Sequence, residues 1–256
     1  MSYAGALLSR ASFPIKLISS RIMPSIIAQN LDVVRRRISA MSLAAGRDSS
    51  SVQLLAVSKN FSADAIRAAH AAGQKAFGEN YMREALGKMT ALYPLRRFIE
   101  WHFIGPIQSN KTRAIAEQFD WVHSIDRLKI ACRLSEQRPT HLPPLNVCVQ
   151  VNISGEASKS GVSPSEIAAL ARDIVLLPRL QLRGLMSIPE PVSGLHIKGA
   201  PHRRLRELFD AVNAQDLHLD TLSMGMSSDF SEAILEGATI VRVGTALFGD
   251  RPYQTH

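Results

Sequence analysis

Several residues that can do chemistry come directly after short apolar runs, at positions where a chain leaves a buried strand. Lys59 is the clearest case, because it follows the run Leu-Leu-Ala-Val-Ser at positions 54–58. A lysine held partly out of water loses its proton more readily and can add to a carbonyl group as a Schiff base. A solvated surface charge is the alternative interpretation, and the lysine alone does not decide between the two.

The loops after the last two apolar runs suit an anion. The segment 223–229 reads Ser-Met-Gly-Met-Ser-Ser-Asp, and Gly244 and Thr245 follow the final run. Glycine lets the backbone approach a phosphate closely, and the N–H groups at a helix start face it with a favourable dipole. A helix cap at Ser227 and a tight turn at Gly244 would explain either loop alone, but both loops together favour phosphate binding. A phosphate-bearing aldehyde that joins a lysine is pyridoxal 5'-phosphate, which is the expected cofactor.

Arg242 lies in the last apolar run, between Val241 and Val243. Side chains alternate along a strand, so the arginine faces the opposite side from both valines. Inside a barrel it needs a partner, and either a pyridine nitrogen or an acidic side chain would serve. Beside a pyridine nitrogen, the guanidinium would disfavour protonation of the ring, because two positive charges would be adjacent. The cofactor would then be a weak electron sink, suited to little chemistry or to proton transfer.

A regular set of elements must position these residues. Apolar runs of β type alternate with helix-like stretches, which predicts parallel β/α units and, with eight of them, a single (β/α)8 barrel of the TIM type. The chemistry of such barrels lies at the C-terminal ends of the strands, where Lys59 and both loops fall. An open doubly wound sheet is the alternative, but no G-x-G-x-x-G follows the first strand. The expected strands are 53–58, 76–78, 102–104, 121–123, 147–151, 182–186, 221–223 and 240–243.

Helices are expected before the first strand and between successive strands. An extra N-terminal helix is expected to begin at Pro24, which suits a first helical turn, and to continue towards Gly46. The other expected helices are 63–72, 81–92, 109–118, 126–137, 164–177, 202–214 and 229–236.

Residues 1–22 differ in composition from the remainder, with five serines, three basic residues and no acidic residue. This composition is typical of an organelle transit peptide, and an upstream start codon with Met23 as the effective start is the alternative. We therefore expect a disordered leader or extension over 1–22 and the barrel over 23–256. The expected location is the cytoplasm, or the mitochondrion if residues 1–22 are a transit peptide.

Composition excludes several classes of function. The chain has 256 residues and a formal net charge of +8, but the first 50 residues hold seven basic residues against two acidic ones. The nearly neutral remainder argues against a nucleic-acid partner. Two cysteines and eight dispersed histidines argue against a disulfide framework and a metal-dependent hydrolase. The sequence contains no run of about 18 apolar residues, so it does not predict a membrane span.

Eight segments, in order along the chain, resemble the pyridoxal phosphate homeostasis proteins, one-domain relatives of the alanine racemase barrel. Each segment is short, but the ordered set is specific and covers about residues 30–250. Residues 1–22 and the proline-rich stretch 189–201 depart from the family pattern. The matching segments are LLAVSK at 54–59, FGENY at 77–81, WHFIGPIQSNK at 101–111, VNIS at 151–154, SKSG at 158–161, GLM at 184–186, LSMGMSSD at 222–229 and VRVGTALFG at 241–249.

The resemblance implies a role for each matched position. Lys59 would hold the cofactor as a Schiff base, and Arg242 would face the pyridine nitrogen. Lys159 matches a lysine suspected of helping cofactor transfer. The residues implied at the phosphate are Ser223, Gly225, Gly244 and Thr245, and those implied near the ring are Asn80, His102 and Met224.

The resemblance also implies a carrier that buffers and delivers vitamin B6 cofactor, influences amino-acid and keto-acid balance and acts as a monomer, with apo enzymes as partners. It assigns no catalytic residue. The rival is a pyridoxal phosphate-dependent amino-acid racemase or decarboxylase. Related racemases are implied to use a second base, a tyrosine from a partner subunit's extra domain, and we expect that domain to be absent because the chain ends at His256. Tyr81 could act alone, although a half-buried loop aromatic is the simpler interpretation.

Overall fold

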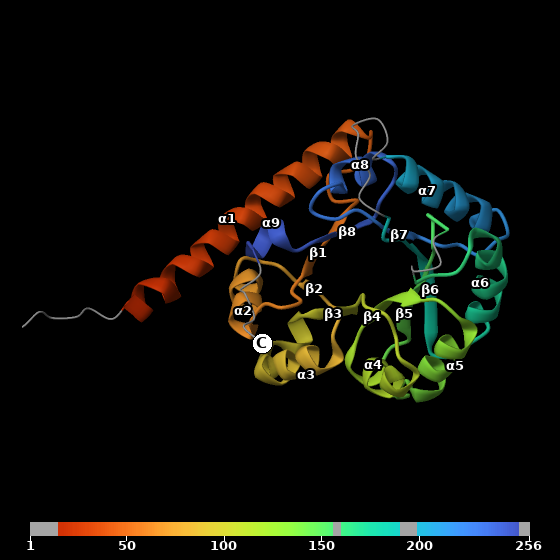
Figure 1. The fold of residues 1–256 in the computed structure, drawn as a ribbon, viewed down its shortest axis with the longest axis horizontal. Helices are drawn as coiled ribbons and strands as arrows, with labels where there is room; N and C mark the ends of the chain where they lie inside the picture. Colours follow the sequence, from red (N-terminus) through yellow and green to blue (C-terminus); the bar gives the residue numbers. More distant parts are fainter. Residues whose placement is uncertain (1–14, 156–159, 190–198, 251–256) are drawn as a thin grey trace, which may run out of the picture.

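Eight parallel strands form a closed barrel in the computed structural model (Figure 1), which describes residues 15–155, 160–189 and 199–250. Each strand pairs with its neighbours in chain order, and β1 closes the barrel against β8 with Leu55 beside Arg242. The predicted TIM-type barrel is therefore confirmed. The strands are β1 (Gln53–Val57), β2 (Ala76–Glu79), β3 (Glu100–Phe103), β4 (Trp121–Ile125), β5 (Leu145–Gln150), β6 (Leu180–Met186), β7 (Thr221–Ser223) and β8 (Ile240–Val243).

A helix follows each strand and covers the outside of the barrel (Figure 1). The predicted helices are all present, with bounds that differ by a few residues. Two short elements were not predicted, the 3-10 helix η1 (Tyr93–Phe98) and the four-residue helix α9 (Thr245–Phe248). The remaining helices are α2 (Ala63–Ala71), α3 (Met82–Ala91), η2 (Ser109–Lys111), α4 (Thr112–Gln118), α5 (Leu128–Gln137), η3 (Pro164–Glu166), α6 (Ile167–Val175), α7 (Ala200–Asn213) and α8 (Phe230–Leu235).

The N-terminal helix α1 (Ile15–Ala44) is longer than expected. It begins at Ile15 rather than at Pro24, so residues 15–22 of the predicted leader or extension fall within the bounds of this helix. Pro14 precedes the helix directly in the sequence and suits a first turn as well as Pro24 does. Residues 1–14 lie outside the described part of the chain.

Burial of one side of α1 attaches it to the barrel. The buried side chains of this helix include Ile27, Leu31, Val34 and Ile38, and the helix packs against α2, α8 and α9. Side-chain hydrogen bonds add to this packing, for example from Asn30 Nδ2 to the Leu247 carbonyl at 3.0 Å. No helix among the described residues is long and apolar enough to cross a membrane.

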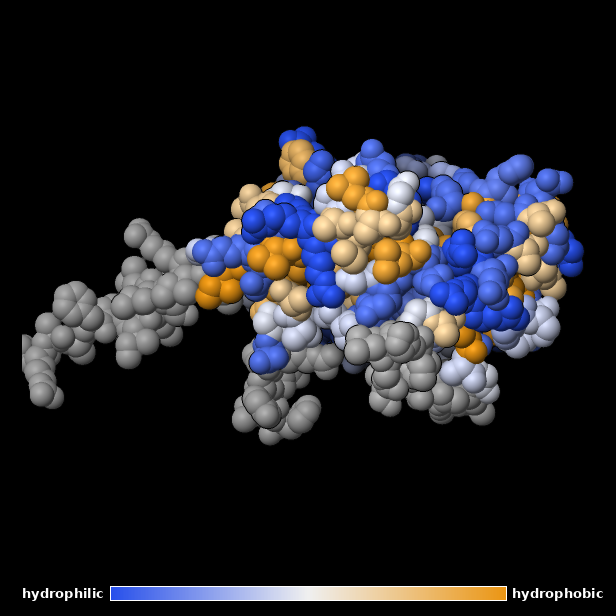
Figure 2. All heavy atoms as spheres, turned by 90° about the horizontal axis from the view of Figure 1, so that it is seen from above, coloured by the Kyte–Doolittle hydropathy of each residue, from blue (hydrophilic) through white to orange (hydrophobic). Residues whose placement is uncertain are grey.

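The strands are buried on both faces, as parallel strands under helices should be. Their outward side chains join the helices in one large apolar core. Their inward side chains form a smaller apolar cluster along the barrel axis, which is Leu55, Val57, Ala76, Ile104, Trp121, Cys148, Met186 and Ile240. On the outer surface, polar and apolar residues are interspersed over the face in Figure 2.

Candidate functional site

A cavity of about 210 Å3 opens at the C-terminal end of the barrel. Each lining residue lies at the end of a strand or in the loop after it, which is where barrel enzymes carry their chemistry. The volume is below the roughly 300–1,000 Å3 of sites for drug-sized ligands, so the cavity suits a compact ligand. The lining residues are Val57, Lys59, Asn80, Ile104, Ile188, Met226, Ser227, Arg242, Gly244 and Thr245.

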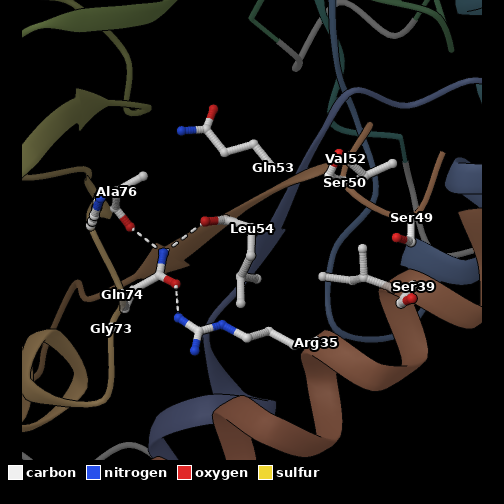
Figure 3. Close-up of a pocket in the computed structure, with 12 residues that line it drawn as sticks. Arg35, Ser39, Ser49, Ser50, Val52, Gln53, Leu54, Gly73, Gln74 and Ala76 are labelled. Atoms are coloured by element: carbon white, nitrogen blue, oxygen red, sulfur yellow. Dashed lines mark hydrogen bonds between the residues drawn. The ribbon is translucent and has the colours of Figure 1, made fainter.

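Two larger cavities, of about 490 and 420 Å3, lie at the opposite end of the barrel, where β1 and β2 begin. Figure 3 shows the first of them. Its central polar group, Gln74, donates to the carbonyls of Leu54 and Ala76 and accepts from Arg35. These polar groups use their hydrogen-bonding capacity on one another, which is typical of contacts that stabilise the fold rather than bind a ligand. We therefore assign the site to the smaller cavity at the C-terminal end.

A buried ion pair fixes the loops that carry Lys59 and Asn80. The Lys88 ammonium donates to Glu79 Oε1 and to the carbonyl of Ser58, both at 2.7 Å, and Ser58 Oγ donates to the same carboxylate at 2.6 Å. Burial raises the pKa of Glu79, and Lys88 and Ser58 oppose this shift by stabilising the charged form. The two loops are thus joined immediately beside the half-buried Lys59.

Asn80 offers an unused hydrogen-bonding group to the cavity. Its Oδ1 atom is buried without a hydrogen-bond partner among the described residues. Its backbone is held closely by the loop after β3, because a Cβ atom at Gly105 would collide with the Asn80 carbonyl. A buried amide oxygen without a partner costs free energy, so this position is suited to a ligand that donates or to a bound water.

The loops after β7 and β8 are joined at the cavity. Ser227 Oγ accepts from the Gly244 N–H at 3.4 Å, and Asp229 Oδ1 accepts from the Met226 N–H at 2.7 Å. Burial acts to raise the pKa of Asp229, but hydrogen bonds from His202 and Met226 outweigh it, so the pKa is lowered. The first loop turns at Gly225, where φ is +87° and a Cβ atom would collide with α8.

Arg242 is held by three donated hydrogen bonds. Its side chain donates to the Ser223 carbonyl at 2.7 Å, to Ser223 Oγ at 2.8 Å and to the Ser187 carbonyl at 2.7 Å. Burial lowers the pKa of Arg242 to about 10, against the opposing charge of Asp229, so the guanidinium stays cationic at pH 7. Among the described residues, Arg242 forms no salt bridge. The ion pair with an acidic side chain, which was one of the two partners expected from the sequence, is therefore not found within that part of the chain.

The structure brings five of the ten predicted site residues to the cavity: Lys59, Asn80, Arg242, Gly244 and Thr245. His102, Ser223, Met224 and Gly225 are buried behind the lining. Lys159 lies outside the described residues.

Three of these four residues have side chains whose directions follow from strand alternation. Ser223 points into the barrel, where its hydroxyl contacts Arg242 and His123. Met224 is the next residue and points outward into the core under the helices. His102 lies deeper in the barrel, stacked on Trp121 with ring centroids 5.4 Å apart.

Sequence reasoning also missed part of the lining. Ser227 was not singled out individually: it belongs to the loop after β7 that the sequence predicts to bind phosphate, with a helix cap as the alternative, and it lines the cavity. The apolar wall consists of Val57, Ile104, Ile188 and Met226. Ile104 comes directly after β3 and Ile188 is the second residue after β6, so the rule that identified Lys59 could have found them.

Comparison with known proteins agrees with this architecture. Residues 29–252 match the family described as alanine racemase, N-terminal domain. A pyridoxal phosphate homeostasis protein from Pseudomonas aeruginosa is 62% identical over 229 residues, which are 90% of this chain and 97% of the relative. The protein of the same name from Escherichia coli is 51% identical over 228 residues, which are 89% of this chain and 97% of the relative.

Solved structures share the fold. The PipY protein of Synechococcus elongatus, solved with PLP bound, is 38% identical with a TM-score of 0.76, and the match covers 87% of this chain and all of PipY. Alanine racemase from Corynebacterium glutamicum has a TM-score of 0.65 at 18% identity, and the match covers 91% of this chain and 63% of that one. The chain therefore belongs to the pyridoxal phosphate homeostasis proteins, within the family defined by the alanine racemase N-terminal domain.

Proposed function

We propose that this protein binds pyridoxal 5'-phosphate as a Schiff base on Lys59 and acts as a carrier that buffers the cofactor rather than as an enzyme. The observation that carries the proposal is the convergence of Lys59, Arg242 and the joined loops after β7 and β8 on one compact cavity. The names of the relatives and the PLP bound to PipY support the same cofactor.

The lining fits the parts of this cofactor. The aliphatic side chains of Val57, Ile104 and Ile188 suit the faces of an aromatic ring. Ser227, Gly244 and Thr245 supply hydroxyl and backbone N–H groups of the kind that bind phosphate. Asn80 Oδ1, which has no partner in the described residues, can accept from a donor on the ligand.

Arg242 limits what the cofactor can do. Bound pyridoxal phosphate supplies an electron sink for carbanions. A cationic guanidinium beside the ring nitrogen keeps that nitrogen unprotonated, which weakens the sink. Arg242 is held as a cation by the carbonyls of Ser223 and Ser187, so the protein favours holding the cofactor over using it.

The lining also lacks a second proton-transferring group. Lys59 is the single side chain with an amine, carboxylate, imidazole, thiol or phenol among the described lining residues. Tyr81 is 55% exposed and does not line the cavity. Racemisation needs proton removal on one face of the substrate and return on the other, which one base does poorly.

Cofactor binding is tested by titrating pyridoxal phosphate into the protein and following its visible absorption. We expect Lys59→Ala to abolish the band of the lysine-bound form. Lys75→Ala is the matched control, because Lys75 is exposed at the opposite end of the barrel, and it should bind like the unaltered protein. An unchanged band in Lys59→Ala would refute the assignment of the lysine.

The carrier role is tested with protein that has been loaded with pyridoxal phosphate. Mixed with an apo enzyme that needs the cofactor, it should restore activity faster than when a dialysis membrane separates the two. Incubated with L-alanine in heavy water, it should give negligible D-alanine and little deuterium uptake. Racemisation above about 1 s⁻¹, the lower end for ordinary enzymes, would favour the racemase instead.

A further inference from the structure

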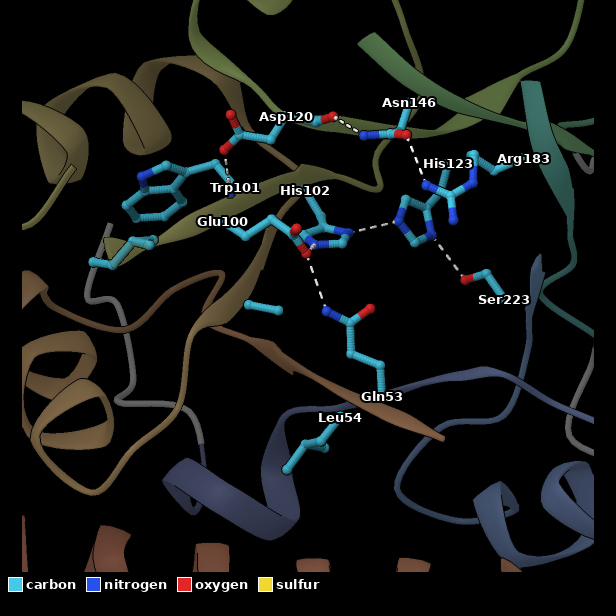
Figure 4. A network of polar contacts seen from close by, with 12 residues as sticks. Gln53, Leu54, Glu100, Trp101, His102, Asp120, His123, Asn146, Arg183 and Ser223 are labelled. Carbon is cyan, nitrogen blue, oxygen red and sulfur yellow. Dashed lines mark hydrogen bonds and ion pairs between the residues drawn. The ribbon is translucent and has the colours of Figure 1, made fainter. Parts of the chain in front are cut away.

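A continuous series of polar side chains crosses the interior of the barrel from its N-terminal end to Arg242 at the cavity, and Figure 4 shows the part from Gln53 to Ser223. Gln53 donates to Glu100 at 3.0 Å, and His102 Nε2 lies 2.7 Å from the same carboxylate oxygen. His102 Nδ1 lies 2.8 Å from His123 Nε2, and His123 Nδ1 lies 2.8 Å from Ser223 Oγ. Arg242 donates to that hydroxyl at 2.8 Å. We call these residues the interior chain: Gln53, Glu100, His102, His123, Ser223 and Arg242.

The middle of the interior chain is completely buried. His102, His123 and Ser223 have no exposed surface, and their neighbours along the axis are apolar or weakly polar side chains such as Leu55 and Cys148. Burying polar groups there is unfavourable unless each is hydrogen-bonded. An apolar core would close the barrel without this requirement, so barrel closure alone does not explain the interior chain.

The chemistry of the partners gives the interior chain one direction. A guanidinium can only donate, so Ser223 Oγ accepts from Arg242. Donation of the single Ser223 hydrogen to Nδ1 of His123 then leaves no buried donor unused, which favours this direction. His123 must then donate from Nε2 to His102 Nδ1. His102 in turn donates from Nε2 to the Glu100 carboxylate. Both imidazoles are neutral Nε2–H tautomers, an assignment that follows from the network of partners.

The charges at the two ends agree with this direction. Burial acts to raise the pKa of Glu100, but hydrogen bonds from His102 and Gln53 outweigh it and lower the pKa, so the carboxylate is ionised at pH 7. Burial, to which the charge of Arg242 adds, places the pKa of His123 well below its ordinary value, so this imidazole is neutral. The Glu100 side chain is 39% exposed at the N-terminal end, and Arg242 lines the cofactor cavity.

We propose that the interior chain orients Arg242 and preserves its charge at the cavity, so that His123 is a positioning residue although it does not line the cavity. The inference rests on the proposed cofactor site, because Arg242 would act there on the ring nitrogen of the bound cofactor. Ser223 can accept from Arg242 in a fixed direction only while His123 accepts from Ser223. Removing the imidazole frees the hydroxyl to turn and leaves the guanidinium less well fixed.

The first experiment needs no cofactor. Nitrogen-15 NMR of the imidazoles in the unaltered protein reports which ring nitrogen carries hydrogen, and the variants His102→Asn and His123→Asn assign the signals. We expect neutral Nε2–H tautomers for both His102 and His123 at pH 7. An Nδ1–H tautomer or an imidazolium at either position would overturn the proposal, whether or not the protein binds pyridoxal phosphate.

The second experiment uses protein loaded with pyridoxal phosphate that carries nitrogen-15 in the ring. We expect His123→Phe, which has no acceptor for Ser223, to shift the ring signal towards that of a protonated pyridine and to weaken cofactor binding about tenfold. His123→Asn, whose amide oxygen can replace Nδ1 as acceptor, should stay near the unaltered protein. Cys148→Ala is the control, because it removes a buried side-chain atom inside the barrel without touching the interior chain, and it should leave the ring signal unchanged.

The outcomes separate the two proposals. If the unaltered protein does not bind the cofactor, the proposed function fails, while the tautomers still decide the interior chain. If it binds and the ring signal of His123→Phe equals that of Cys148→Ala, the positioning role of His123 is overturned. If His123→Phe does not fold, the tautomers and His123→Asn decide, and a shifted ring signal in the asparagine variant would contradict the proposal.

Discussion

Buried side chains fix the positions of the residues at the cavity. The ion pair between Glu79 and Lys88 shows this most clearly, because it holds the loops that carry Lys59 and Asn80. Both side chains are buried, and Lys88 also lies 2.5 Å from Glu84. One carboxylate thus anchors the end of β1 and the end of β2 at once. A buried pair of this kind adds little stability compared with apolar residues, but removing one partner leaves a charge without compensation.

Replacing Lys88 should therefore destabilise the protein in a pH-dependent way. We expect Lys88→Met to lower the free energy of unfolding by about 3–5 kcal/mol at neutral pH. Burial already raises the pKa of Glu79, and losing Lys88 raises it further. The folded state then favours the protonated acid, so stability is retained below the ordinary carboxyl pKa and lost as pH rises through the folded pKa.

Urea unfolding at pH 5 and pH 7.5 measures this effect. Glu79→Gln combined with Lys88→Met removes both charges and should recover much of the loss at the higher pH. Arg36→Met is the surface control, because its pair with Asp32 is exposed and should contribute less than about 1 kcal/mol. Equal losses for Lys88→Met at both pH values would contradict the role assigned to Glu79.

At the scale of elements, the loop between β7 and α8 determines whether the cavity forms. Gly225 adopts φ of +87°, and its Cα lies so close to α8 that a Cβ atom would meet Ala233 and Phe230. This contact sets where Met226 and Ser227 lie, and Ser227 connects to the β8 loop through the Gly244 N–H. The position of the turn at Gly225 therefore depends on its packing against α8.

Gly225→Ala should destabilise the protein and weaken cofactor binding together. The left-handed backbone costs about 1 kcal/mol for alanine, and the steric overlap with α8 adds to it. Gly46→Ala is a matched control, because Gly46 has φ of +68° with open space where the Cβ would be placed. Thermal unfolding and cofactor titration should show a loss for Gly225→Ala that exceeds the loss for Gly46→Ala in both measurements. Equal effects would show that backbone strain alone matters at Gly225.

The described buried side chains of α1 begin at Ile27. Deleting residues 1–22 therefore leaves all of these described contacts in place. We expect Tm to fall by less than about 5 °C, which corresponds to roughly 1–2 kcal/mol for a chain of this size. Leu31→Ala, which truncates a fully buried side chain of the same helix, should cost about 2–5 kcal/mol and lower Tm further. A larger fall for the deletion than for Leu31→Ala would show that the leader packs on the barrel.

For the whole molecule, the barrel could be predicted from the sequence because each strand is a short apolar run and each is followed by helical patterning. The helix α9 was missed, because its four residues are too few to show a period. Lys59, Gly244 and Thr245 were found because position relative to a strand end is a local property of the sequence. Arg242 was found from the alternation of side chains within its strand, and Asn80 from the resemblance to the family.

The partners of these residues could not be predicted in the same way. His123 and Ser223 are 100 residues apart in the chain, and their hydrogen bond depends on the register of β4 and β7 in the closed barrel. The bounds of β7 were predicted correctly as 221–223, but which of its side chains face the barrel axis depends on the register of the closed sheet, which an apolar run does not give. Local pattern therefore identified the cavity, while the residues that support it required the three-dimensional structure.

The central claim is that Lys59 holds pyridoxal phosphate. It is tested most directly by reducing the loaded protein with borohydride, digesting it and locating the added pyridoxyl mass by mass spectrometry. We predict the mass on the peptide that contains Lys59, in the unaltered protein and in Lys75→Ala, and none there in Lys59→Ala. Reduction that places the mass on another lysine, or on none, would contradict the account.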